Sequence, residues 1–424
     1  MKIVVIGTLD TKGPEVGFVR DEVARRGHDP LVIDPGILGE PALPADVTRQ
    51  QVAEAAGVRL PDLIATGDRQ HCQQAMIRGI VEIVSRLHDE GQVDGVVAVG
   101  GAQGTAMATA AMRALPVGVP KVMVSTVACG QTTFGPYVGT KDITMIHSVA
   151  DILGLNRVTQ RILAQAAAAV GAMASVTAVA DAGRELVAIT QAGITTPGVM
   201  AIKEWLEGLG FEVVAFHCNG IGGQAMEALI SDGVVKGVID FSPHEITDLL
   251  FGGLMPAMPG RLEAAGQMGI PQIVTPGATD IRLHGRPEEL PAGLRQRACV
   301  QHTPTHTHVR TSAEEMAAVA RTIAERLNAG SGPRAVMIPQ QGYSMLNRQG
   351  QVLYDEASNR AFAQAMEEAL LPEVEFITVD AHINDRAFAE AVVTAFLRLR
   401  GERAEPGTKT ARPGNAKSAG DEPA

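Results

Sequence analysis

A glycine-rich turn in the first half of the chain has the residue types that bind anions. Gly95–Thr109 reads GVVAVGGAQGTAMAT, in which Val96–Val99 is typical of a buried strand and the segment from Thr105 to Leu115 predicts a helix. Glycine lets the backbone approach a ligand closely, and the first N–H groups of a helix point outward at the positive end of its dipole. A turn without a ligand also favours glycine, and the string matches neither standard phosphate-binding fingerprint. On the ligand-binding interpretation, the phosphate contacts are Gly100, Gly101, Gln103, Gly104 and Thr105.

The loop after the first predicted strand, TLDTKG at Thr8–Gly13, offers three kinds of polar group. Thr8 and Thr11 carry hydroxyl groups. Asp10 is suited to hold a metal ion or a ligand hydroxyl, and Lys12 is long enough to reach a phosphate. The alternative interpretation is an Asx-type turn that caps the next helix.

Further positions are expected at the same edge of the sheet. Asp34 ends the second predicted strand, where an acid either binds ribose hydroxyls, as in dinucleotide folds, or caps a helix or a turn. Ser125 and Thr126 follow a buried strand, and Gly139 and Thr140 lie in the long glycine-rich loop after it. Because parallel strands end at one edge of the sheet, these loops together predict a site for an adenine nucleotide or a sugar phosphate.

The second half of the chain is richer in side chains that exchange protons. Asp380 and His382 follow a predicted strand, with the spacing either of an acid–base pair or of a structural ion pair. Other polar residues also follow predicted strands, among them Asn219, Asp240, His244, Asp248, Asp280 and Arg310. The catalytic candidates selected from this half are His217, Glu245, His302, Asp380 and His382.

Three histidines, His302, His306 and His308, have a spacing that resembles a metal site. In an extended segment all three would point to one side. Pro304 interrupts that geometry and no cysteine joins the set, so a solvated or hydrogen-bonded loop is the favoured interpretation. We therefore expect no metal ligands in this chain.

Both halves alternate predicted strands and helices, which favours parallel sheets. We expect two Rossmann-like, doubly wound α/β domains that face a cleft, over residues 1–180 and 181–400, and a disordered tail over residues 401–424. The predicted elements that bear most on the site are a strand at Lys2–Gly7, a loop at Thr8–Gly13, a helix from Pro14 to Arg26, a strand at Pro30–Asp34, a strand at Val119–Ser125 and a helix from Val149 to Met173.

Composition excludes several classes of protein. The 424 residues carry a net charge of −11 and only 3% aromatic residues, which argues against nucleic acid as a main partner. No apolar run reaches the roughly 18 residues of a membrane span, and no leader with a cleavage site is apparent. The four cysteines are widely spaced, as in a reduced compartment. We expect a cytoplasmic protein without a membrane or nucleic-acid partner.

Several strings resemble those of a known family. IGTLDTKGPEVGFVRDEV, LPVGVPKVMVSTVACGQT and VDAHINDRAFAEA look like segments of the largely uncharacterised family named for the ATP-binding inhibitory domain of the tomato mosaic virus resistance protein. The resemblance covers about Met1 to Arg400, although the GGAQGT loop and the SPHE string depart from the family pattern. It implies two Rossmann-like subdomains, a homodimer, and ATP, with Mg²⁺ as a candidate companion ion, at Thr8, Asp34, Gly101, Thr105, Thr126 and Gly139.

Three functional hypotheses follow. The first is an ATP-binding protein that acts on a small polar or phosphorylated metabolite in the cleft between its domains. The second is a module without catalytic activity that senses a nucleotide and binds a protein partner. The third is an enzyme that acts on a nucleotide sugar or a sugar phosphate. Fold alone does not choose among them, because one fold supports many functions.

Overall fold

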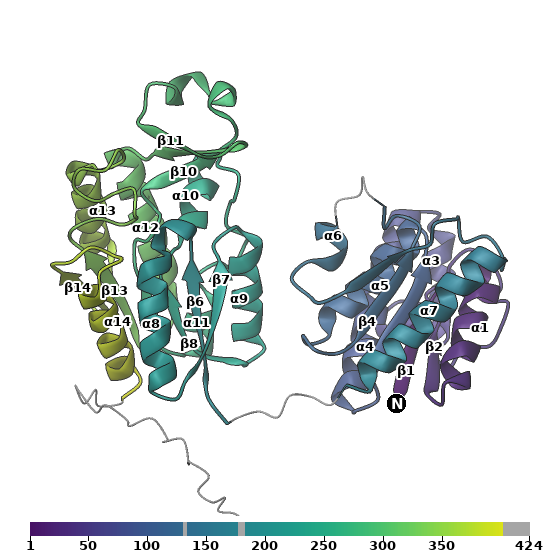
Figure 1. Cartoon of the computed structure of the whole chain (residues 1–424). Helices are drawn as coiled ribbons and strands as arrows, with labels where there is room; N and C mark the ends of the chain where they lie inside the picture. The colour runs from purple at the N-terminus through teal and green to yellow at the C-terminus, as the bar shows by residue number, and fades with distance from the viewer. Residues whose placement is uncertain (130–133, 177–182, 402–424) are drawn as a thin grey trace, which may run out of the picture. The chain divides into compact units, whose positions relative to one another are not determined.

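The computed structural model describes residues 1–129, 134–176 and 183–401. The chain divides into two compact units, Met1–Ala182 and Gly183–Ala424 (Figure 1). Each unit is described by itself below. The tail expected to be disordered lies outside the described residues, apart from Gly401.

The first unit is built on a five-stranded sheet in the order β2-β1-β3-β4-β5, and all neighbouring strands are parallel. This confirms the α/β class expected from the alternating pattern. The elements are β1 (Lys2–Ile6), α1 (Leu9–Arg25), β2 (Asp29–Ile33), α2 (Arg49–Ala55), α3 (Leu60–Ala65), α4 (Arg69–Asp89), β3 (Gly95–Gly100), α5 (Ala102–Ala114), β4 (Lys121–Ser125), α6 (Gly135–Val138), β5 (Thr144–His147) and α7 (Arg157–Ala174).

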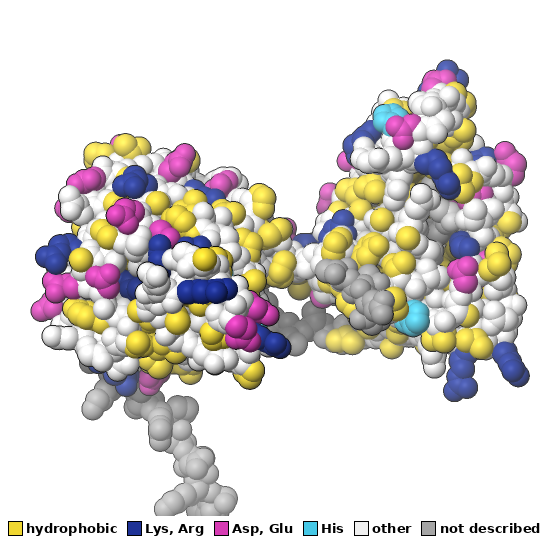
Figure 2. Space-filling view, turned by 90° about the horizontal axis from the view of Figure 1, so that it is seen from above, with side chains coloured by type: hydrophobic (Ala, Val, Ile, Leu, Met, Phe, Trp, Pro, Cys, Tyr) yellow, Lys and Arg dark blue, Asp and Glu magenta, His cyan; other side chains and the backbone are white. Residues whose placement is uncertain are grey.

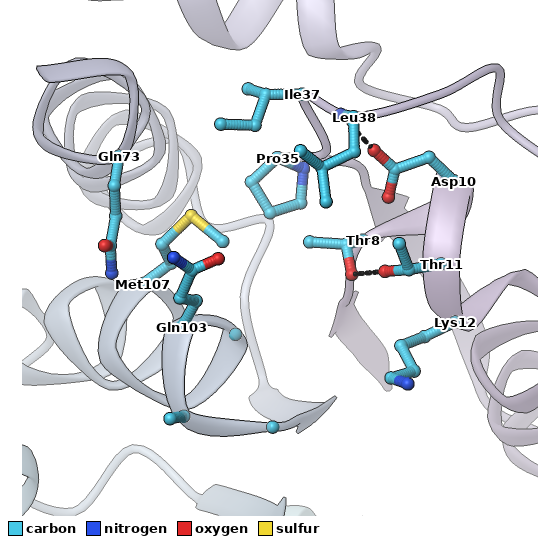
Figure 3. Close-up of a pocket in the computed structure, with 13 residues that line it drawn as sticks. Thr8, Asp10, Thr11, Lys12, Pro35, Ile37, Leu38, Gln73, Gln103 and Met107 are labelled. Atoms are coloured by element: carbon cyan, nitrogen blue, oxygen red, sulfur yellow. Dashed lines mark hydrogen bonds between the residues drawn. The ribbon is translucent and has the colours of Figure 1, made fainter. Parts of the chain in front are cut away.

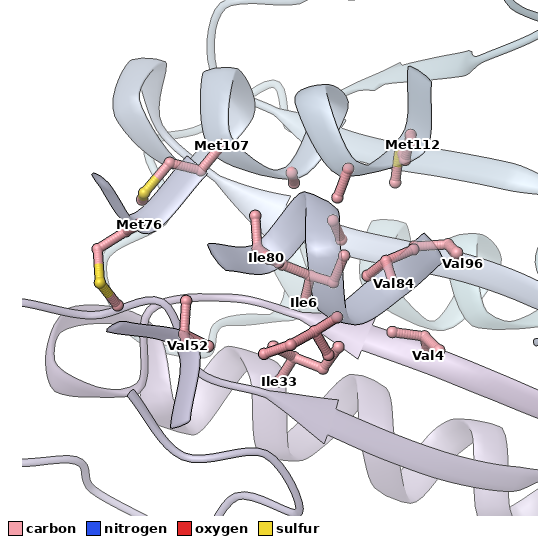
Figure 4. Close-up of a cluster of buried hydrophobic side chains, with 14 of the residues drawn as sticks. Val4, Ile6, Ile33, Val52, Met76, Ile80, Val84, Val96, Met107 and Met112 are labelled. Carbon is pink, nitrogen blue, oxygen red and sulfur yellow. The ribbon is translucent and has the colours of Figure 1, made fainter. Parts of the chain in front are cut away.

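Successive strand residues face opposite sides of this sheet, so each strand feeds two hydrophobic cores. In β1, Val4 and Ile6 pack with α4 and α5, as Figure 4 shows. Ile3 and Val5 pack on the other face with α1 and α7. Full burial of one such side chain stabilises the fold by about 1.5–3 kcal/mol. The β-branched runs of the sequence are therefore strands covered by helices on both faces.

The second unit contains a six-stranded parallel sheet in the order β14-β13-β9-β8-β6-β7. Helices α8 and α14 cover one face of this sheet. The elements are β6 (Leu186–Gln191), a 3-10 turn η1 (Gly193–Thr195), α8 (Thr196–Gly208), β7 (Glu212–His217), α9 (Ile221–Ser231), β8 (Val235–Asp240), α10 (His244–Phe251), α11 (Ala264–Met268), β9 (Gln272–Val274), β10 (Ile281–His284), η2 (Pro287–Glu289), η3 (Ala292–Leu294), β11 (Cys299–Thr303), β12 (His306–Arg310), α12 (Ala313–Ala329), β13 (Arg334–Pro339), α13 (Glu356–Ala369), β14 (Val374–Val379) and α14 (Arg386–Leu399).

A three-stranded antiparallel sheet in the order β10-β12-β11 was not anticipated from the sequence. It is inserted between β9 and α12. The loop interpretation of the histidine run is wrong here, because His302 lies in β11 and both His306 and His308 lie in β12. Pro304 falls in the turn between these two strands, where a proline disturbs no ladder hydrogen bond.

Both parallel sheets reverse their strand order next to their first strand. In open α/β sheets, ligands bind beyond the carboxyl ends of the strands at such a reversal. The reversal lies between β1 and β3 in the first unit and between β6 and β8 in the second. The topology therefore indicates one candidate site in each unit.

Helix α1 starts earlier than the sequence indicates, so the predicted loop Thr8–Gly13 is wrong over most of its length. The helix begins at Leu9, whose N–H donates to the Asp34 carboxylate at 3.0 Å. Pro14 then falls inside the helix, and the backbone leaves helical geometry at Lys12 (φ −129°, ψ 20°). This kink accommodates the proline ring, which would otherwise clash with the preceding turn.

Two other helix starts also differ from the prediction. Helix α5 begins at Ala102 rather than Thr105, with Gly101 as its N-cap. Helix α7 begins at Arg157 rather than Val149, because the Asn156 side chain accepts from the N–H groups of the first turn.

A buried charge cluster holds the second unit together behind the end of β8. The guanidinium of Arg261, which is 1% exposed, donates to Glu245 at 2.5 Å, to Glu227 at 3.0 Å and to Asp240 at 2.5 Å. Glu245 also accepts the Gly220 N–H at 2.7 Å, Glu227 accepts the Leu262 N–H at 2.6 Å, and Asp240 accepts the Thr190 hydroxyl at 2.9 Å. Burial lowers the pKa of Arg261, but the charge of Asp240 and its neighbours outweighs burial and raises it. Burial raises the pKa of Glu227 above its usual value, against the opposing charge of Arg261. The cluster thus sets three carboxyl groups around one buried guanidinium.

On the face seen in Figure 2, lysine and arginine side chains are scattered among acidic and hydrophobic ones. The described helices include none that is long and apolar enough to cross a membrane.

Candidate functional site

The first unit has a cavity of about 330 Å³ at the carboxyl ends of β1, β2 and β3, where the strand order reverses (Figure 3). We call it the first-unit pocket. Its lining residues come from α1, the segment after β2, α4 and the start of α5. They are Thr8, Asp10, Thr11, Lys12, Pro35, Ile37, Leu38, Gln73, Gly101, Ala102, Gln103, Gly104 and Met107.

One wall of the first-unit pocket is the N-terminus of α5. Its N-cap, Gly101, has no side chain to accept a hydrogen bond from the first turn. The N–H groups of Ala102, Gln103 and Gly104 therefore have no partner within the helix or from the cap, and carry the positive end of the dipole. The residue before the N-cap is also a glycine for a steric reason. A Cβ on Gly100 would lie 2.8 Å from Gly104 Cα, so glycine lets the first turn of α5 pack closely against the end of β3.

The opposite wall comes from the start of α1. Asp10 Oδ2 accepts from the N–H groups of Leu38 at 2.6 Å and Gly39 at 3.2 Å. Asp10 Oδ1 is buried, and no described residue gives it a hydrogen bond. Thr8 and Thr11 share a hydrogen bond of 2.7 Å between their hydroxyl oxygens.

Lys12 completes the polar lining. Its ammonium group donates to the Ile152 carbonyl, and an ammonium has three donors, so two remain for other acceptors. Figure 3 shows this side chain on the same side of the pocket as Thr8 and Thr11. One end of the pocket thus combines a cation with a helix N-terminus.

The rest of the first-unit pocket is apolar, with two amides. Pro35, Ile37 and Leu38 lie on the segment after β2, and Met107 faces the cavity from α5. The side chains of Gln73 and Gln103 project beside Met107 in Figure 3. Flat apolar surfaces with amide donors and acceptors at their edge suit a planar heterocycle.

Seven of the residues expected to bind the ligand line this pocket, and Asp34 does not. Asp34 Oδ1 accepts from the N–H groups of Leu9 at 3.0 Å and Gly36 at 2.8 Å. Burial raises the pKa of this carboxyl above its usual value. Asp34 thus caps α1, which was the alternative interpretation. The seven that line the pocket are Thr8, Asp10, Thr11, Lys12, Gly101, Gln103 and Gly104.

Thr105 and Ser125 lie beneath the pocket rather than in it. Both are fully buried, and their hydroxyl oxygens are 2.6 Å apart, so the pair fixes α5 against β4. Thr126 is next to the N-cap, since a Cβ on Gly101 would lie 3.8 Å from its hydroxyl.

Gly139 and Thr140 lie near the other end of α5. A Cβ on Gly139 would be 3.0 Å from Cδ of Arg113, which is in the last turn of that helix. A helix of 13 residues is roughly 20 Å long, so these two residues are remote from the pocket. Sequence reasoning in turn missed Pro35, Ile37, Leu38, Gln73, Ala102 and Met107; for the first three, the Gly/Pro-rich stretch after β2 was the available signal.

The second unit has its own cavity of about 200 Å³, which we call the histidine pocket. It lies at the ends of β6 and β7 and the start of α10, with β10, β11 and β12 contributing the remaining wall. The lining residues are Ala192, Gly193, Ile194, His217, Cys218, His244, Met255, Ile281, Leu283, His302, Thr303, His306 and His308. Five of them are histidines.

Two histidines of this pocket have pKa values that shift in opposite directions. Burial lowers the pKa of His244, but Asp248, whose Oδ2 lies 3.3 Å from His244 Nε2, outweighs burial and raises it. Burial together with the nearby His302 and His244 lowers the pKa of His308 to about 4. The rings of His302 and His308 stack with centroids 4.6 Å apart.

Neutral His308 has a consequence for stability. An unfolded histidine has a pKa near 6.5, so between about pH 6.5 and 4 the unfolded chain binds more protons at this position. Neutral His308 therefore contributes fully to the stability of the second unit above about pH 6.5. This contribution, on the order of 3 kcal/mol, is lost as the pH falls towards about 4. Urea denaturation of the second unit at several pH values measures this loss. His308→Asn should flatten the profile, and an unchanged slope would contradict the assignment.

The five catalytic candidates do not gather at one place. His217 and His302 line the histidine pocket, whereas Glu245 belongs to the Arg261 cluster. Asp380 accepts from the Gln341 amide at 3.0 Å. His382 is buried; its Nε2 lies 2.9 Å from the Ser344 carbonyl and its Nδ1 accepts from the Asn384 N–H. Both nitrogens of His382 thus have structural partners. Within the described ranges, no group of three or more His, Cys, Asp or Glu is arranged to hold a metal.

Comparisons with known proteins place both units. A model described as "Uncharacterised protein family (UPF0261) N-terminal domain" matches residues 1–179, and the corresponding C-terminal domain matches residues 184–400. A UPF0261 protein of Clostridium tetani is 41% identical over 400 residues, covering 94% of this chain and 98% of that protein. A UPF0261 protein of Rhizobium meliloti is 38% identical over 397 residues, covering 93% and 98%.

A plant protein also matches. The ToMV resistance protein Tm-1(GCR237) of Solanum lycopersicum is 35% identical over 333 residues, covering 76% of this chain and 44% of that protein. Among solved structures, UDP-GlcNAc 2-epimerase from Neisseria meningitidis is 10% identical with a TM-score of 0.21, covering 94% of this chain and all of that one. A score this low leaves the chemistry of each pocket to be argued from its own residues.

Proposed function

The chain belongs to the uncharacterised protein family UPF0261, and we propose that its first unit binds an adenine nucleotide in the first-unit pocket. The observation that carries this proposal is the pairing, across one cavity, of an uncapped helix N-terminus with a buried carboxylate oxygen to which none of the described residues donates. The first suits a phosphate and the second suits a hydroxyl group. A nucleotide presents both.

The phosphates would contact the first turn of α5. Backbone N–H groups of Ala102, Gln103 and Gly104 donate to phosphate oxygens there, and the dipole favours the negative charge. Lys12 adds a point charge from α1. An Mg²⁺ that enters with a triphosphate would take its ligands from phosphate oxygens and water, and it would neutralise phosphate charge.

The ribose and base would occupy the remainder. Asp10 Oδ1 is placed to accept a hydrogen bond from a ribose hydroxyl, in the role that the sequence suggested for Asp34. Ile37, Leu38 and Met107 supply apolar contact for the base, and the Gln73 amide offers a donor and an acceptor to its edge. The choice of adenine is supported by the resemblance to the ATP-binding inhibitory domain family. The cavity of about 330 Å³ is at the lower end of the roughly 300–1,000 Å³ of ligand pockets.

The tomato relative is named as a resistance protein, which favours a second candidate role. In it, the nucleotide-bound chain acts by binding a protein partner rather than by turning over a substrate. Incubation of the purified full chain with ATP separates the roles: phosphate release supports an enzyme, whereas ATP binding without release supports a sensor. Competition by UDP-sugars in the same assay would indicate a nucleotide-sugar site instead.

Lys12→Ala tests the phosphate end of the pocket. We expect the ATP affinity to fall by about tenfold, because one charge-assisted contact is lost. Isothermal titration calorimetry measures the affinity. The matched control is Lys2→Ala, since Lys2 lies at the start of β1, at the opposite edge of the same sheet, and donates to Gln92. Equal affinities for the two variants would contradict the placement of the phosphates.

A further inference from the structure

We propose that the histidine pocket of the second unit binds a small anionic metabolite through its carboxylate or phosphate group. The nucleotide proposal uses nothing in this unit, so the two stand or fall separately. The pocket occupies the position that the sheet topology favours for a ligand, next to the reversal between β6 and β8.

The hydrogen-bonding groups of the lining favour an anion. Five histidines line the cavity, and the described residues that line it include no carboxylate. Asp248 lies behind His244, with Oδ2 at 3.3 Å from His244 Nε2, and it also accepts from the N–H groups of Leu283 and Met255. The other four histidines, His217, His302, His306 and His308, each carry a ring N–H that is able to donate to the oxygen of an anion.

His308 gives an independent indication of a ligand. The residue is 7% exposed, and its Nδ1 is buried with no hydrogen-bond partner among the described residues. A buried polar atom without a partner is costly, and such atoms in a cavity mark places where a ligand or a water binds. A neutral imidazole can carry its proton on Nδ1, so this atom is able to donate to a carboxylate or phosphate oxygen.

Two helix starts add partial positive charge at the same edge. Gly193 and Ile194, which line the pocket, belong to η1, and η1 runs directly into the 13-residue helix α8. His244 is the first residue of α10. Helix N-termini attract anions, so the backbone and the histidines act in the same direction.

Size and access limit the ligand class. The cavity of about 200 Å³ is smaller than the roughly 300 Å³ at which pockets for drug-sized ligands begin, so a compact metabolite fits better than a nucleotide. Ile194, Ile281 and Leu283 provide contact for a short carbon skeleton. His217 and His302 are exposed and give a route from solvent.

The test uses the full chain with ¹³C,¹⁵N-labelled histidine, titrated with inorganic phosphate and, separately, with glycolate. We expect one or both probes to shift the ring signals of His302 and His308, and the probe that binds more tightly identifies phosphate or carboxylate as the recognised group.

In His302→Ala, whose site is exposed and tolerant, affinity for that probe should fall about tenfold or more. His308→Asn tests the buried position. His147→Ala, an exposed histidine at the end of β5 in the first unit, is the matched control and should bind as the unmodified chain does.

Two outcomes would overturn the proposal. One is that the ring signals of the pocket histidines do not shift with either probe at concentrations up to about 10 mM, which would put the dissociation constant above the millimolar range. The other is stoichiometric binding of Zn²⁺ alone that is lost in both variants, which would make the pocket a metal site. ATP is titrated into the same samples as a separate experiment. His302 and His308 lie in the other unit, so nucleotide binding to the first unit and anion binding to the histidine pocket are judged independently.

Discussion

Gly101→Asp is expected to lower the ATP affinity of the first unit by about 100-fold or more while leaving that unit as stable as before, or slightly more stable. Gly101 has φ −77° and ψ −163°, which any residue adopts, and a Cβ there meets only Thr126 Oγ1 at 3.8 Å. Aspartate at an N-cap accepts from the N–H groups of the first turn. It therefore occupies the donors that a phosphate needs and adds a negative charge beside it, an effect of roughly 2.7 kcal/mol or more on binding.

Calorimetry with ATP and thermal denaturation of the same samples measure the two effects. Gly101→Ala is the matched control, because it adds a Cβ without charge or capping oxygen and should keep most of the affinity. If Gly101→Asp binds ATP as tightly as the unmodified chain, the phosphates do not lie on the first turn of α5. The opposite signs of the two effects separate a direct loss of binding from misfolding.

Arg261→Met is expected to destabilise the second unit by about 3–5 kcal/mol, because removal of one partner leaves buried charges without compensation. Arg261 contacts Asp240, Glu227 and Glu245. Glu227 and Glu245 also accept backbone N–H groups and Asp240 accepts the Thr190 hydroxyl, so none of the three can move into water without losing these hydrogen bonds. For a unit of this size the melting temperature of the second transition should fall by about 10 °C.

Differential scanning calorimetry of the full chain resolves this effect, and Arg398→Met is its control. Arg398 pairs with Glu375 on the surface, with side chains 54% and 40% exposed, and such pairs contribute only about 0–1 kcal/mol. Similar shifts for the two variants would show that the buried contacts of Arg261 contribute no more to stability than a surface ion pair does. Repeated in the presence of ATP, the same scan reports whether Arg261→Met still binds the nucleotide in the first unit.

Much of the fold could be predicted from local pattern, because β-branched runs and amphipathic segments record which faces are buried. The runs at Val96–Val99 and in β1 became central strands for this reason. Helix starts were less accurate. Asp34, 25 residues away in sequence, accepts from the Leu9 N–H. Gly104, which was expected before the helix, lies inside α5, where its Cα would be 2.8 Å from a Cβ on Gly100. Contacts between residues far apart in the sequence produce no periodic pattern of hydrophobic residues, so the sequence does not reveal them.

The candidate site was predicted in part. Strand-end reasoning correctly brought Asp10 and Lys12 together with Gly101, since all follow parallel strands at the reversal of the sheet. It also included Gly139, because the edge of a sheet is wider than one pocket. Gly139 lies at the far end of α5, next to Arg113. In the second unit, His302 was selected for chemistry and His308 only for metal spacing. Their common pocket depends on an antiparallel sheet that pairs β11 with β12 across a proline turn, and alternation alone did not show it.

The most direct test of the central claim is a crystal structure of the full chain grown with ATP and Mg²⁺. We predict phosphate density against the backbone N–H groups of Ala102 to Gly104, with a ribose hydroxyl on Asp10 Oδ1. Nucleotide density elsewhere on the first unit, or an empty pocket in crystals soaked at saturating ATP, would contradict the account.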